Sequence, residues 1–408
     1  MANEMSSRER MLAALNCEKP DHVPMAFMIF GALNQRLNNT RRGGDQATVI
    51  EEQIGLGLDT VVDLTHFTPQ VEEIGHSDAP GFPVRLAESV KTRQWAQNLE
   101  GNRYPLLHKE YVTPSGRLSI EVEQTEDWPY GDAAKGDFQV PLLDDYLSPR
   151  CLKYLVETRD DLVSLRHLLV PPTEKDLNAC HKEWRKGKEL ARKHDLLLAG
   201  GWGVGSDALA WFCGLQNAVL MAIDDPAFFE ELLSIIDAWN RPRMQAFLDF
   251  GVDLFIRRAW YEGTDFWSPD LYRKFFFPII REEVRMAHEA GVKYGYILTS
   301  GSMPLHDMLI QLGIDVLIGP DPVQGKATDL NSMGEQLRGS MCTWGGVNGF
   351  ITVEEGTKAD IDTAVRDAIE ALGPDGFILS PVDNVRDPSD ETWEKVLALI
   401  ESWKKYRG

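Results

Sequence analysis

The sequence has few cysteines, and their spacing matches no metal-binding or redox pair. The five are scattered along 408 residues without a C-x-x-C motif: Cys17, Cys151, Cys180, Cys213 and Cys342. An odd and sparse count in a chain of this length argues against a disulfide framework. We therefore expect a cytoplasmic protein in a reducing compartment.

Long hydrophobic runs are also missing. No segment approaches the roughly 18 apolar residues of a membrane span, and the segment MANEMSSRERMLAAL lacks the apolar centre of a signal peptide. Positive charge is scarce, because 42 Lys and Arg face 63 Asp and Glu, for a net charge of −21 at pH 7. Such a polyanion repels nucleic acid and anionic lipid, so we expect neither nucleic acid nor membrane as a partner.

What the sequence does contain is a regular alternation of short apolar runs and helical periodicities. The runs expected to be strands are residues 23–30, 60–64, 195–199, 252–256, 293–298, 315–318, 342–344 and 377–379. Most are unbroken apolar segments, as is typical of parallel strands buried on both faces. Eight such strands alternating with helices predict an α/β fold, a (β/α)8 TIM barrel. An open doubly wound sheet is the alternative.

One stretch departs from this alternation. Residues from about 84 to 140 contain alternating segments and the turn sequence TPSG at 113–116, which predicts a β-hairpin insertion before the third barrel strand. Internal repeats, low-complexity tracts and flexible linkers are missing. We therefore expect residues 1–408 to form a single elaborated domain.

In a TIM barrel, the chemistry lies at the carboxyl ends of the strands. The candidate residues expected there are His66, Trp202, Arg257, Arg258, Trp260, Tyr261, Glu262, Ser300, Asn348 and Asp383. The loop GGWGVG at 200–205 is similar to a dinucleotide fingerprint, but Ser206 stands where the third glycine belongs. We interpret these glycines as letting the backbone bend into the mouth of the barrel.

Two arginines, Arg257 and Arg258, interrupt a buried strand. Side chains alternate across a strand, so only one of them faces the barrel axis. It would anchor a substrate carboxylate or phosphate, for which the guanidinium fork is suited. The alternative is a structural pair between Arg257 and Asp253, which share a face of the strand.

The residues Trp260, Tyr261 and Glu262 bring flat apolar surface together with a phenol and a carboxyl group. This combination suits a planar ligand, although aromatic residues at a strand end also serve packing. His66 and Asp383 are candidate acid–base groups or metal ligands, and each is equally explained as a hydrogen-bonded loop residue.

Zinc held by cysteine is not expected. Among the cysteines only Cys342 falls on a barrel strand, and it lies at the start of the strand, away from the expected mouth. Zinc held by His66, Glu262 or Asp383 stays open.

Several segments resemble the uroporphyrinogen decarboxylase superfamily over nearly the whole chain. They are SSRERMLAALNCEKPDHVPMAF, GGWGVGSDALAWFCGLQNAVLMAIDDPAFFEELL, FWSPDLYRKFFFPIIREEV, YGYILTSGSMPLHDMLIQLGIDVLIGPD and FILSPVDNVRDPSDETW. The resemblance implies a TIM barrel that either decarboxylates porphyrinogens or transfers methyl groups with corrinoid proteins.

Departures from the family patterns narrow the implied reaction. Porphyrinogen decarboxylases carry R-Q-A-G-R after the first strand, whereas this chain has no arginine there before Arg36. Zinc methyltransferases carry His-x-Cys-Gly after the fifth strand and a Cys after the eighth, where this chain has Leu298, Ser300 and Asp383. The branch of the superfamily that this chain still resembles is that of the O-demethylation methyltransferases. Their insertion before the third strand is similar to residues 84–169.

The resemblance therefore implies a methyltransferase that moves a methyl group from a methoxylated, aromatic small molecule to the cobalt of a corrinoid (cobalamin) on a partner protein. Reduced cobalt is the nucleophile, and the leaving phenoxide, with a pKa of about 10, needs an acid. Glu262, Tyr261, His66 and Asp383 are the candidates for that acid.

The walls of the ring pocket would be Trp202 and Trp260. Among the acids we single out Glu262, because burial against aromatic rings favours a neutral carboxyl group. The alternative is that Glu262 caps a loop or pairs with Arg258.

Two other functions stay open: decarboxylation of a small acid or porphyrinogen-like substrate, and a non-catalytic barrel that binds a corrinoid or tetrapyrrole. The sequence does not decide the oligomeric state, and a homodimer is compatible with it.

Overall fold

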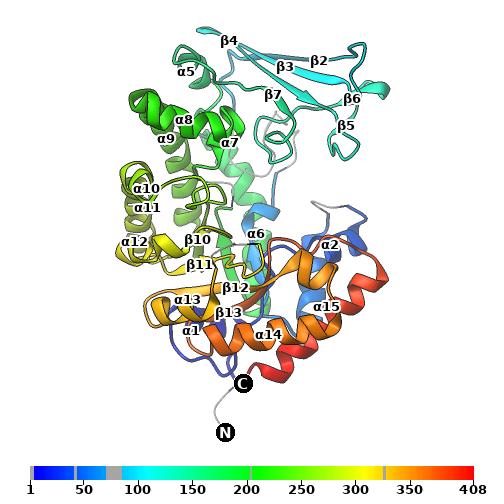
Figure 1. The fold of residues 1–408 in the computed structure, drawn as a ribbon, viewed down its shortest axis with the longest axis vertical. Coiled ribbons are helices and arrows are strands. Elements are labelled where there is room, and N and C mark those ends of the chain that lie inside the picture. The colour runs from blue at the N-terminus through cyan, green and yellow to red at the C-terminus, as the bar shows by residue number, and fades with distance from the viewer. Residues whose placement is uncertain (1–3, 41–43, 70–84, 203–204, 325–327) are drawn as a thin grey trace. The chain divides into compact units, whose positions relative to one another are not determined.

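The computed structural model describes residues 4–40, 44–69, 85–202, 205–324 and 328–408 (Figure 1). The chain divides into two compact units. The first, here called the barrel unit, comprises Met1–Phe67, Lys182–Gly203 and Phe247–Gly408. The second, called the insertion unit, comprises Thr68–His181 and Val204–Ala246.

The barrel unit is built on a parallel sheet of seven strands. In spatial order they are β1 (Val61–Asp63), β8 (Leu197–Gly200), β9 (Leu254–Arg258), β10 (Lys293–Ile297), β11 (Val316–Ile318), β12 (Cys342–Asn348) and β13 (Phe377–Val382). Every neighbouring pair is parallel. Each of these strands overlaps one of the runs expected from the sequence, because strands buried on both faces are unbroken apolar segments.

The remaining expected strand, residues 23–30, closes the sheet without forming a continuous strand. Met25 and Ile29 make isolated parallel bridges to Leu379 and Asn384. On the other side, the carbonyl oxygen of Met25 accepts a hydrogen bond of 2.8 Å from the Asp59 backbone, just before β1. The segment therefore joins the first and last strands, and the predicted (β/α)8 TIM barrel is confirmed.

Local chemistry explains why this closing segment is irregular. Pro24 has no N–H to donate to a neighbouring strand. The N–H of Met28 donates to the side-chain Oγ of Ser380 at 2.9 Å instead of to a carbonyl group. Two ladder hydrogen bonds flank Met25, from Leu379 N to Pro24 O at 2.9 Å and from Ala26 N to Leu379 O at 3.1 Å, and the regular pattern stops at Pro24 and Met28.

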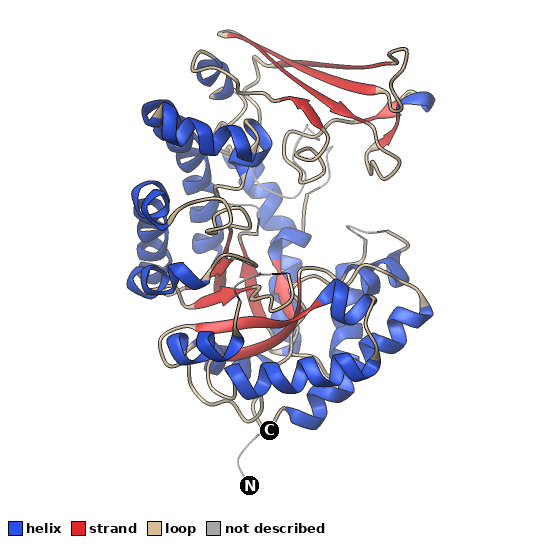
Figure 2. Ribbon diagram, viewed as in Figure 1, coloured by secondary structure: helices blue, strands red, loops and turns tan. Residues whose placement is uncertain are grey.

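Helices lie on the outside of the strands (Figure 2). Those of the barrel unit are α1 (Ser7–Leu15), α2 (Gly31–Asn38), α3 (Gln46–Gly55), η1 (Leu64–His66), α10 (Pro269–Phe275), α11 (Phe277–Glu289), η3 (Met303–Leu305), α12 (His306–Leu312), α13 (Leu330–Leu337), η4 (Gly349–Glu354), α14 (Lys358–Leu372) and α15 (Asp390–Tyr406). Two longer helices, α6 (Glu174–His194) and α9 (Pro226–Phe250), contribute residues to both units.

The capping signals in the sequence set several helix starts. Ser6 and Glu9 form a capping box at α1, in the S-x-x-E spacing that the sequence contains. Ser268 caps α10, with its Oγ accepting from Leu271 N at 3.3 Å. The helical stretch after Ser268 is divided between α10 and α11, because Pro278 cannot donate the hydrogen bond that a continuous helix requires.

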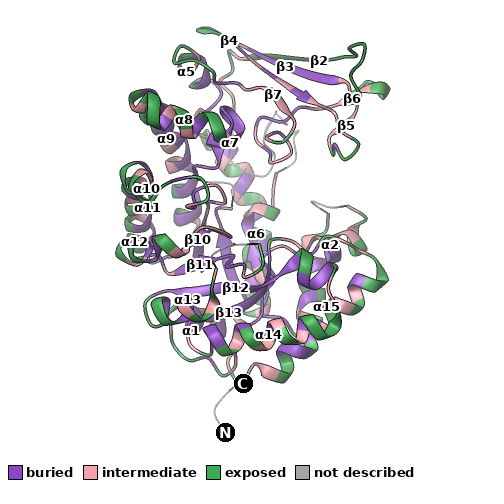
Figure 3. Ribbon diagram, in the orientation of Figure 1, coloured by how far each residue is buried: buried purple, intermediate pink, exposed green. Residues whose placement is uncertain are grey.

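Alternate residues of the strands fill the inside of the barrel, and the strands are almost wholly buried (Figure 3). This interior cluster contains Met11, Ala14, Leu15, Ala26, Met28, Leu197, Ala199, Leu254, Ile256, Ile297, Val316, Ile318, Cys342, Trp344, Ile378 and Val382. The residues from α1 close the end of the barrel at which the strands begin.

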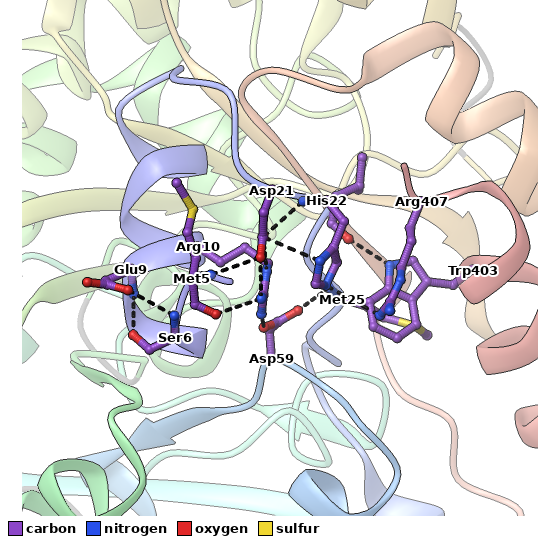
Figure 4. Close-up of polar contacts among 11 residues, drawn as sticks. Met5, Ser6, Glu9, Arg10, Asp21, His22, Met25, Asp59, Trp403 and Arg407 are labelled. Atoms are coloured by element: carbon purple, nitrogen blue, oxygen red, sulfur yellow. Dashed lines mark hydrogen bonds and ion pairs between the residues drawn. The ribbon is translucent and has the colours of Figure 1, made fainter. Parts of the chain in front are cut away.

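The floor of the barrel is held by a buried arginine (Figure 4). Arg10 binds Asp21 through Nε at 2.6 Å and Asp59 through Nη1 at 2.5 Å. The Arg10 guanidinium holds the pKa of Asp21 well below its usual range, while burial raises the pKa of Asp59. One guanidinium thus links α1 to the segments on either side of the closing strand.

The end of the last helix packs on the same floor. Trp403 Nε1 donates to the carbonyl oxygen of Val23 at 2.7 Å, and Arg407 stacks over the Trp403 ring (Figure 4). Burial lowers the pKa of the adjacent His22 to about 4, so this imidazole is neutral at physiological pH.

The insertion unit contains a four-stranded antiparallel sheet in the order β2 (Lys91–Gln97), β3 (Leu106–Thr113), β4 (Gly116–Glu123) and β7 (Cys151–Lys153). The other elements are β5 (Gly131–Asp132), η2 (Ala133–Lys135), β6 (Asp137–Phe138), α5 (Asp161–Leu165), α7 (Ala208–Phe212) and α8 (Leu215–Asp224). The turn at 113–116 joins β3 to β4, with Thr113 paired to Gly116. The structure thus places this hairpin at the centre of a larger sheet, and residue 84 lies outside the described residues.

None of the helices in the described ranges combines the length and the apolar character that crossing a bilayer would require.

Candidate active site

The two arginines of β9 point to opposite sides of the barrel wall. Leu254 and Ile256 belong to the interior cluster, so strand alternation places Arg258 on the axis side. Arg257 points outward and reaches Glu283 on α11, with Nη1 at 2.6 Å from Oε1. The sequence left open which arginine faces the axis, and the structure assigns that place to Arg258.

Arg257 is the centre of a buried ion-pair cluster. Its Nη2 lies 2.6 Å from Oε1 of Glu262, and all three charged side chains are at most 2 % exposed. Burial alone would lower the pKa of Arg257, but the carboxylates of Glu262 and Glu283 hold it well above its usual value. A single permanent cation therefore forms ion pairs with two acidic side chains.

Three tyrosines complete the cluster. Tyr296 donates its hydroxyl to Glu262 Oε2 at 2.6 Å, and Tyr294 donates to Glu283 Oε2 at 2.6 Å. Tyr272 donates to the Tyr296 oxygen at 3.2 Å. Burial raises the pKa of all three phenols, so they stay protonated and act as donors.

These contacts correct two expectations about the pairing of charges. Glu262 pairs with Arg257, the arginine on the outer side of the wall, where the sequence analysis had named Arg258 as its partner. Asp253 pairs with Arg8, Oδ1 to Nη2 at 2.7 Å, and not with Arg257. The carboxyl of Glu262 is thus engaged by Arg257 and Tyr296, an arrangement that anchors the loop after β9.

The end of β9 and the loop after it carry two of the predicted ligand-binding residues, Arg258 and Trp260. The guanidinium carbon Cζ of Arg258 lies 4.4 Å from the centre of the Trp260 ring. The rings of Trp202 and Trp260 have centroids 5.8 Å apart and are tilted by 48°. Both tryptophans are partly buried and pack on the interior cluster. Arg258, Trp202 and Trp260 are here called the mouth triad.

A glycine allows the strand carrying Trp202 to lie close to β9. Gly201 has φ +122°, and a Cβ atom built there would meet the carbonyl oxygen of Ile256 at 2.4 Å. Only glycine satisfies both conditions. This supports the interpretation that the glycines bend the backbone into the mouth, although residues 203–204 lie outside the described residues.

The structure also reveals a buried carboxyl group that the sequence analysis missed. Asp63 is the last residue of β1. The side chain of the next residue, Leu64, lies against Gly187 of the outer helix α6, so the alternation of side chains places Asp63 on the axis side. It is 8 % exposed, and its Oδ1 accepts from Thr65 N and Thr65 Oγ1, both at 2.8 Å. Burial raises the pKa of Asp63 above its usual value. The signal in the sequence was an acidic residue within a run interpreted as apolar.

Other predicted residues lie in the loops around the carboxyl ends of the strands. His66 is exposed at the end of η1, and Asp383 is exposed after β13 with a left-handed φ of +65°. Tyr261 is half-buried, with its ring against the edge of Phe266 at a centroid distance of 6.0 Å.

Asn348 and Ser300 lie at the ends of their strands. Asn348 is buried, caps η4 through its Oδ1, and donates from Nδ2 to Asp321 Oδ2 at 2.7 Å. Ser300 is half-buried in the loop after β10, where Thr264 N donates to Gly301 O at 3.0 Å and joins this loop to the one after β9. Asn348 therefore organises the loop after β12, and its contact with a ligand stays a prediction.

Within the described ranges, no group of three or more His, Cys, Asp or Glu side chains is arranged to hold a metal ion. Cys342 begins β12 inside the interior cluster, and burial raises its thiol pKa well above the usual value. A neutral, enclosed thiol at this end of the barrel is a poor metal ligand.

Fold and site together define a TIM-barrel protein with a cationic and aromatic group at the mouth and a buried carboxyl group nearby. Residues 190–406, more than half of the chain, match the family described as uroporphyrinogen decarboxylase (URO-D). The chain therefore belongs to the uroporphyrinogen decarboxylase family, which confirms the resemblance found in the sequence. Family membership indicates an enzyme of a decarboxylase or methyl-transfer type.

Among solved structures, a methyltransferase from Methanosarcina mazei is similar over 99 % of both chains, with a TM-score of 0.57 and 15 % identity. At this identity the likeness shows a shared fold. A B12-independent methionine synthase from a Shewanella species is similar over 54 % of this chain and 65 % of its own, with a TM-score of 0.36 and 11 % identity, which is too low to carry an argument. No curated protein sequence matches the chain.

Proposed function

We propose that this protein transfers a methyl group from a methoxylated aromatic compound to the cobalt of a corrinoid carried by a separate protein. The observation that carries the proposal is the mouth triad, an aromatic and cationic group, on the same side of the wall as the buried carboxyl of Asp63. Membership of a family of decarboxylase and methyl-transfer types and the fold shared with a methyltransferase support it.

The reaction breaks the bond between the methyl carbon and the ether oxygen. The methyl group leaves without the bonding electrons, and the aryl oxygen keeps them and takes up a proton. The reduced corrinoid supplies the attacking electron pair when its protein is bound. The barrel therefore needs to hold the ring, exclude water and deliver a proton to the oxygen.

Asp63 is suited to hold that proton. Burial raises its pKa and so favours the neutral carboxylic acid. Because Oδ1 already accepts two hydrogen bonds from Thr65, Oδ2 is the oxygen on which this carboxyl would hold a proton. We place Asp63 ahead of Glu262, whose carboxyl is engaged by Arg257, and keep Tyr261, His66 and Asp383 as further candidates on the surrounding loops.

The described residues do not gather a ligand set for zinc, since His66 and Asp383 lie exposed on separate loops. We therefore derive no step through a metal, and the proton donor is a side chain in this proposal.

The test follows methyl transfer from a series of methoxyarenes to reduced free cobalamin, read as loss of the Co(I) absorbance. Asp63→Asn should lower the rate by about 10² to 10⁴ for poor leaving groups, and less as the pKa of the leaving phenol falls. Asp390→Asn is the matched control, because Asp390 is 96 % exposed and pairs only with Arg36 among the described contacts. An equal loss for every donor would show that Asp63 is not the acid, and no alkylation by any donor would refute methyl transfer.

Decarboxylation of a small acid is the second candidate, because Arg258 on the axis side would orient a carboxylate. The same protein incubated with aromatic acids in the absence of corrinoid would then release carbon dioxide. A spectral change with free cobalamin or porphyrin, without turnover of either kind, would instead indicate the non-catalytic barrel.

A further inference from the structure

We infer that Tyr296 is a positioning residue: through Glu262 it holds the turn that carries Trp260, and it thereby sets where that ring lies for an aromatic ligand. Tyr296 is fully buried, and strand alternation places it on the outer side of the wall, because the next residue, Ile297, belongs to the interior cluster. It therefore acts on a ligand only through other residues. The inference rests on the proposed function for the identity of the ligand as a methoxylated arene, whereas the position of the ring is measurable without a ligand.

The first argument comes from the turn that follows β9. Glu262 N donates to Ala259 O at 3.1 Å, which is the hydrogen bond between the first and last residues of a β-turn. Trp260 and Tyr261 are the two central residues of this turn. Ala259 is fully buried directly after the strand. The position of Trp260 is therefore set at one end of the turn by β9 and at the other end by Glu262.

The second argument concerns how the Glu262 end of the turn is held. Arg257 Nη2 lies 2.6 Å from Oε1, and the Tyr296 hydroxyl donates to Oε2 at 2.6 Å. Arg257 Nε lies 3.4 Å from the same Oε2, so Tyr296 is the closer donor to that oxygen. Hydrogen bonds to a charged group in a buried site are strong. Short contacts to both oxygens, from β9 and from β10, fix the orientation of the carboxylate.

The third argument concerns what the turn presents to the mouth. The rings of Trp260 and Trp202 have centroids 5.8 Å apart, and both side chains pack on the interior cluster. Aromatic pairs interact over centroid distances of about 4.5–7 Å. A displacement of the turn by about 1 Å therefore takes this pair to the edge of the range. The hydrogen bond from Tyr296 thus controls the geometry of both rings.

A second contact in the same cluster is nearly identical but leads elsewhere. Tyr294 donates its hydroxyl to Glu283 Oε2, also at 2.6 Å, and shares the outer face of β10 with Tyr296. Both tyrosines are fully buried. Glu283 belongs to α11, on the outside of the barrel, and not to the turn. The chain therefore contains a matched control, with the same donor, acceptor type, distance and burial.

The experiment labels the intact protein with fluorotryptophan and records fluorine NMR spectra without ligand or corrinoid. Trp260→Phe and Trp202→Phe assign the two resonances. Tyr296→Phe should shift or broaden both of them, whereas Tyr294→Phe should leave both in place. Each of the two tyrosine variants loses a buried hydrogen bond to a charged group, so each should raise the unfolding equilibrium constant by about 10- to 150-fold. Equal losses of stability with unequal spectra separate positioning from a general structural role.

A second matched pair of variants applies if Tyr296→Phe does not fold. Glu262→Gln and Glu283→Gln each replace one charged acceptor of Arg257 by an amide of the same size. Glu262→Gln should displace the Trp260 resonance, and Glu283→Gln should not. Circular dichroism of each variant verifies that the fold is retained.

Methyl transfer from methoxybenzene to reduced cobalamin extends the test to a ligand. Tyr296→Phe should raise KM by about 2- to 12-fold, the range expected for one aromatic contact, with kcat nearly unchanged. Asp63→Asn should instead lower kcat. In a Trp260→Phe background, Tyr296→Phe should no longer change KM, because its effect passes through that ring.

Three results would overturn the inference: an unmoved Trp260 resonance in Tyr296→Phe (or in Glu262→Gln, if only that variant folds), an equal displacement in Tyr294→Phe, or a displaced resonance with an unchanged KM. These results are distinct from the test of function. A displaced resonance without methyl transfer from any donor would refute the proposed function and leave the positioning of the ring standing. Methyl transfer by a protein whose Trp260 resonance does not respond to Tyr296→Phe would do the opposite.

Discussion

Removing the guanidinium of Arg257 is the sharpest test of what holds the loop beneath the mouth triad. In Arg257→Met, the carboxylates of Glu262 and Glu283 lose the guanidinium that pairs with both of them, while the two side chains stay buried. Breaking a buried pair by removing one partner costs about 3–5 kcal/mol, because an uncompensated charge remains inside. With a urea slope of about 3 kcal/mol/M, the unfolding midpoint should fall by about 1 to 1.7 M.

The loss should depend on pH in a definite direction. Burial raises the pKa of Glu283, and Arg257 opposes that rise. Without Arg257 the pKa of Glu283 in the folded protein rises further above its value in the unfolded chain. Folding then favours the protonated carboxyl, so the deficit of Arg257→Met relative to the unmodified protein should grow as pH increases from about 5 to 8.

The assay is urea unfolding followed by tryptophan fluorescence and circular dichroism at several pH values. Arg285→Met is the matched control. Arg285 lies on α11, the helix that carries Glu283, and pairs with two glutamates but is 51 % exposed, so its removal should cost at most about 0.5 kcal/mol. Adding Glu262→Gln and Glu283→Gln to Arg257→Met should restore part of the stability. Equal midpoints for the two arginine variants, or a deficit that shrinks with rising pH, would refute the reasoning.

Three further outcomes are expected. Arg10→Met should lower the free energy of unfolding by about 3 kcal/mol in urea titrations, because Asp21 and Asp59 then lack a guanidinium on the barrel floor; an unchanged midpoint would show that the floor does not depend on this pair. Gly201→Ala should lower the melting temperature and weaken methoxyarene binding in fluorescence titrations, because its φ of +122° and the close β9 carbonyl exclude a Cβ atom. Cys342 should react with a thiol reagent at pH 8 only after unfolding, because burial raises its pKa, and fast labelling of the folded protein followed by mass spectrometry would contradict this.

The fold could be predicted from the sequence because its signals are local. The runs that became β11 and β13 are unbroken apolar segments between helical periodicities, and a buried parallel strand requires that pattern. The segment around Met25 carried the same apolar signal but forms only two isolated bridges. The difference arises from Pro24, which removes a donor, and from Ser380, whose side chain takes another.

The site was only half predictable, because its decisive contacts join distant elements. The alternation of side chains along a strand predicted that one of Arg257 and Arg258 faces the axis. Which of the two does so depends on Glu283 of α11, which lies 26 positions from Arg257 and binds it on the outer side. Because Arg257 is held on the outer side, it also binds Glu262 and so anchors the loop after β9. Asp63 was missed for a different reason, since a single acidic residue within a short apolar run carries no periodic signal. Trp202 and Trp260 were predicted as two walls of a ring pocket. Their rings lie 5.8 Å apart between centroids, and their role as pocket walls stays a prediction.

The irregular seam at Met25 has a consequence for how the chain is made. The partners at this seam are among the most distant in the sequence, with Met28 and Ser380 lying 352 positions apart. Contacts of such long range form slowly, and during synthesis the first of these residues emerges long before the last. The segment around Met25 therefore stays without its β13 partner while the intervening residues are synthesised. Once β13 has been synthesised, it pairs with the segment around Met25 and closes the ring of strands.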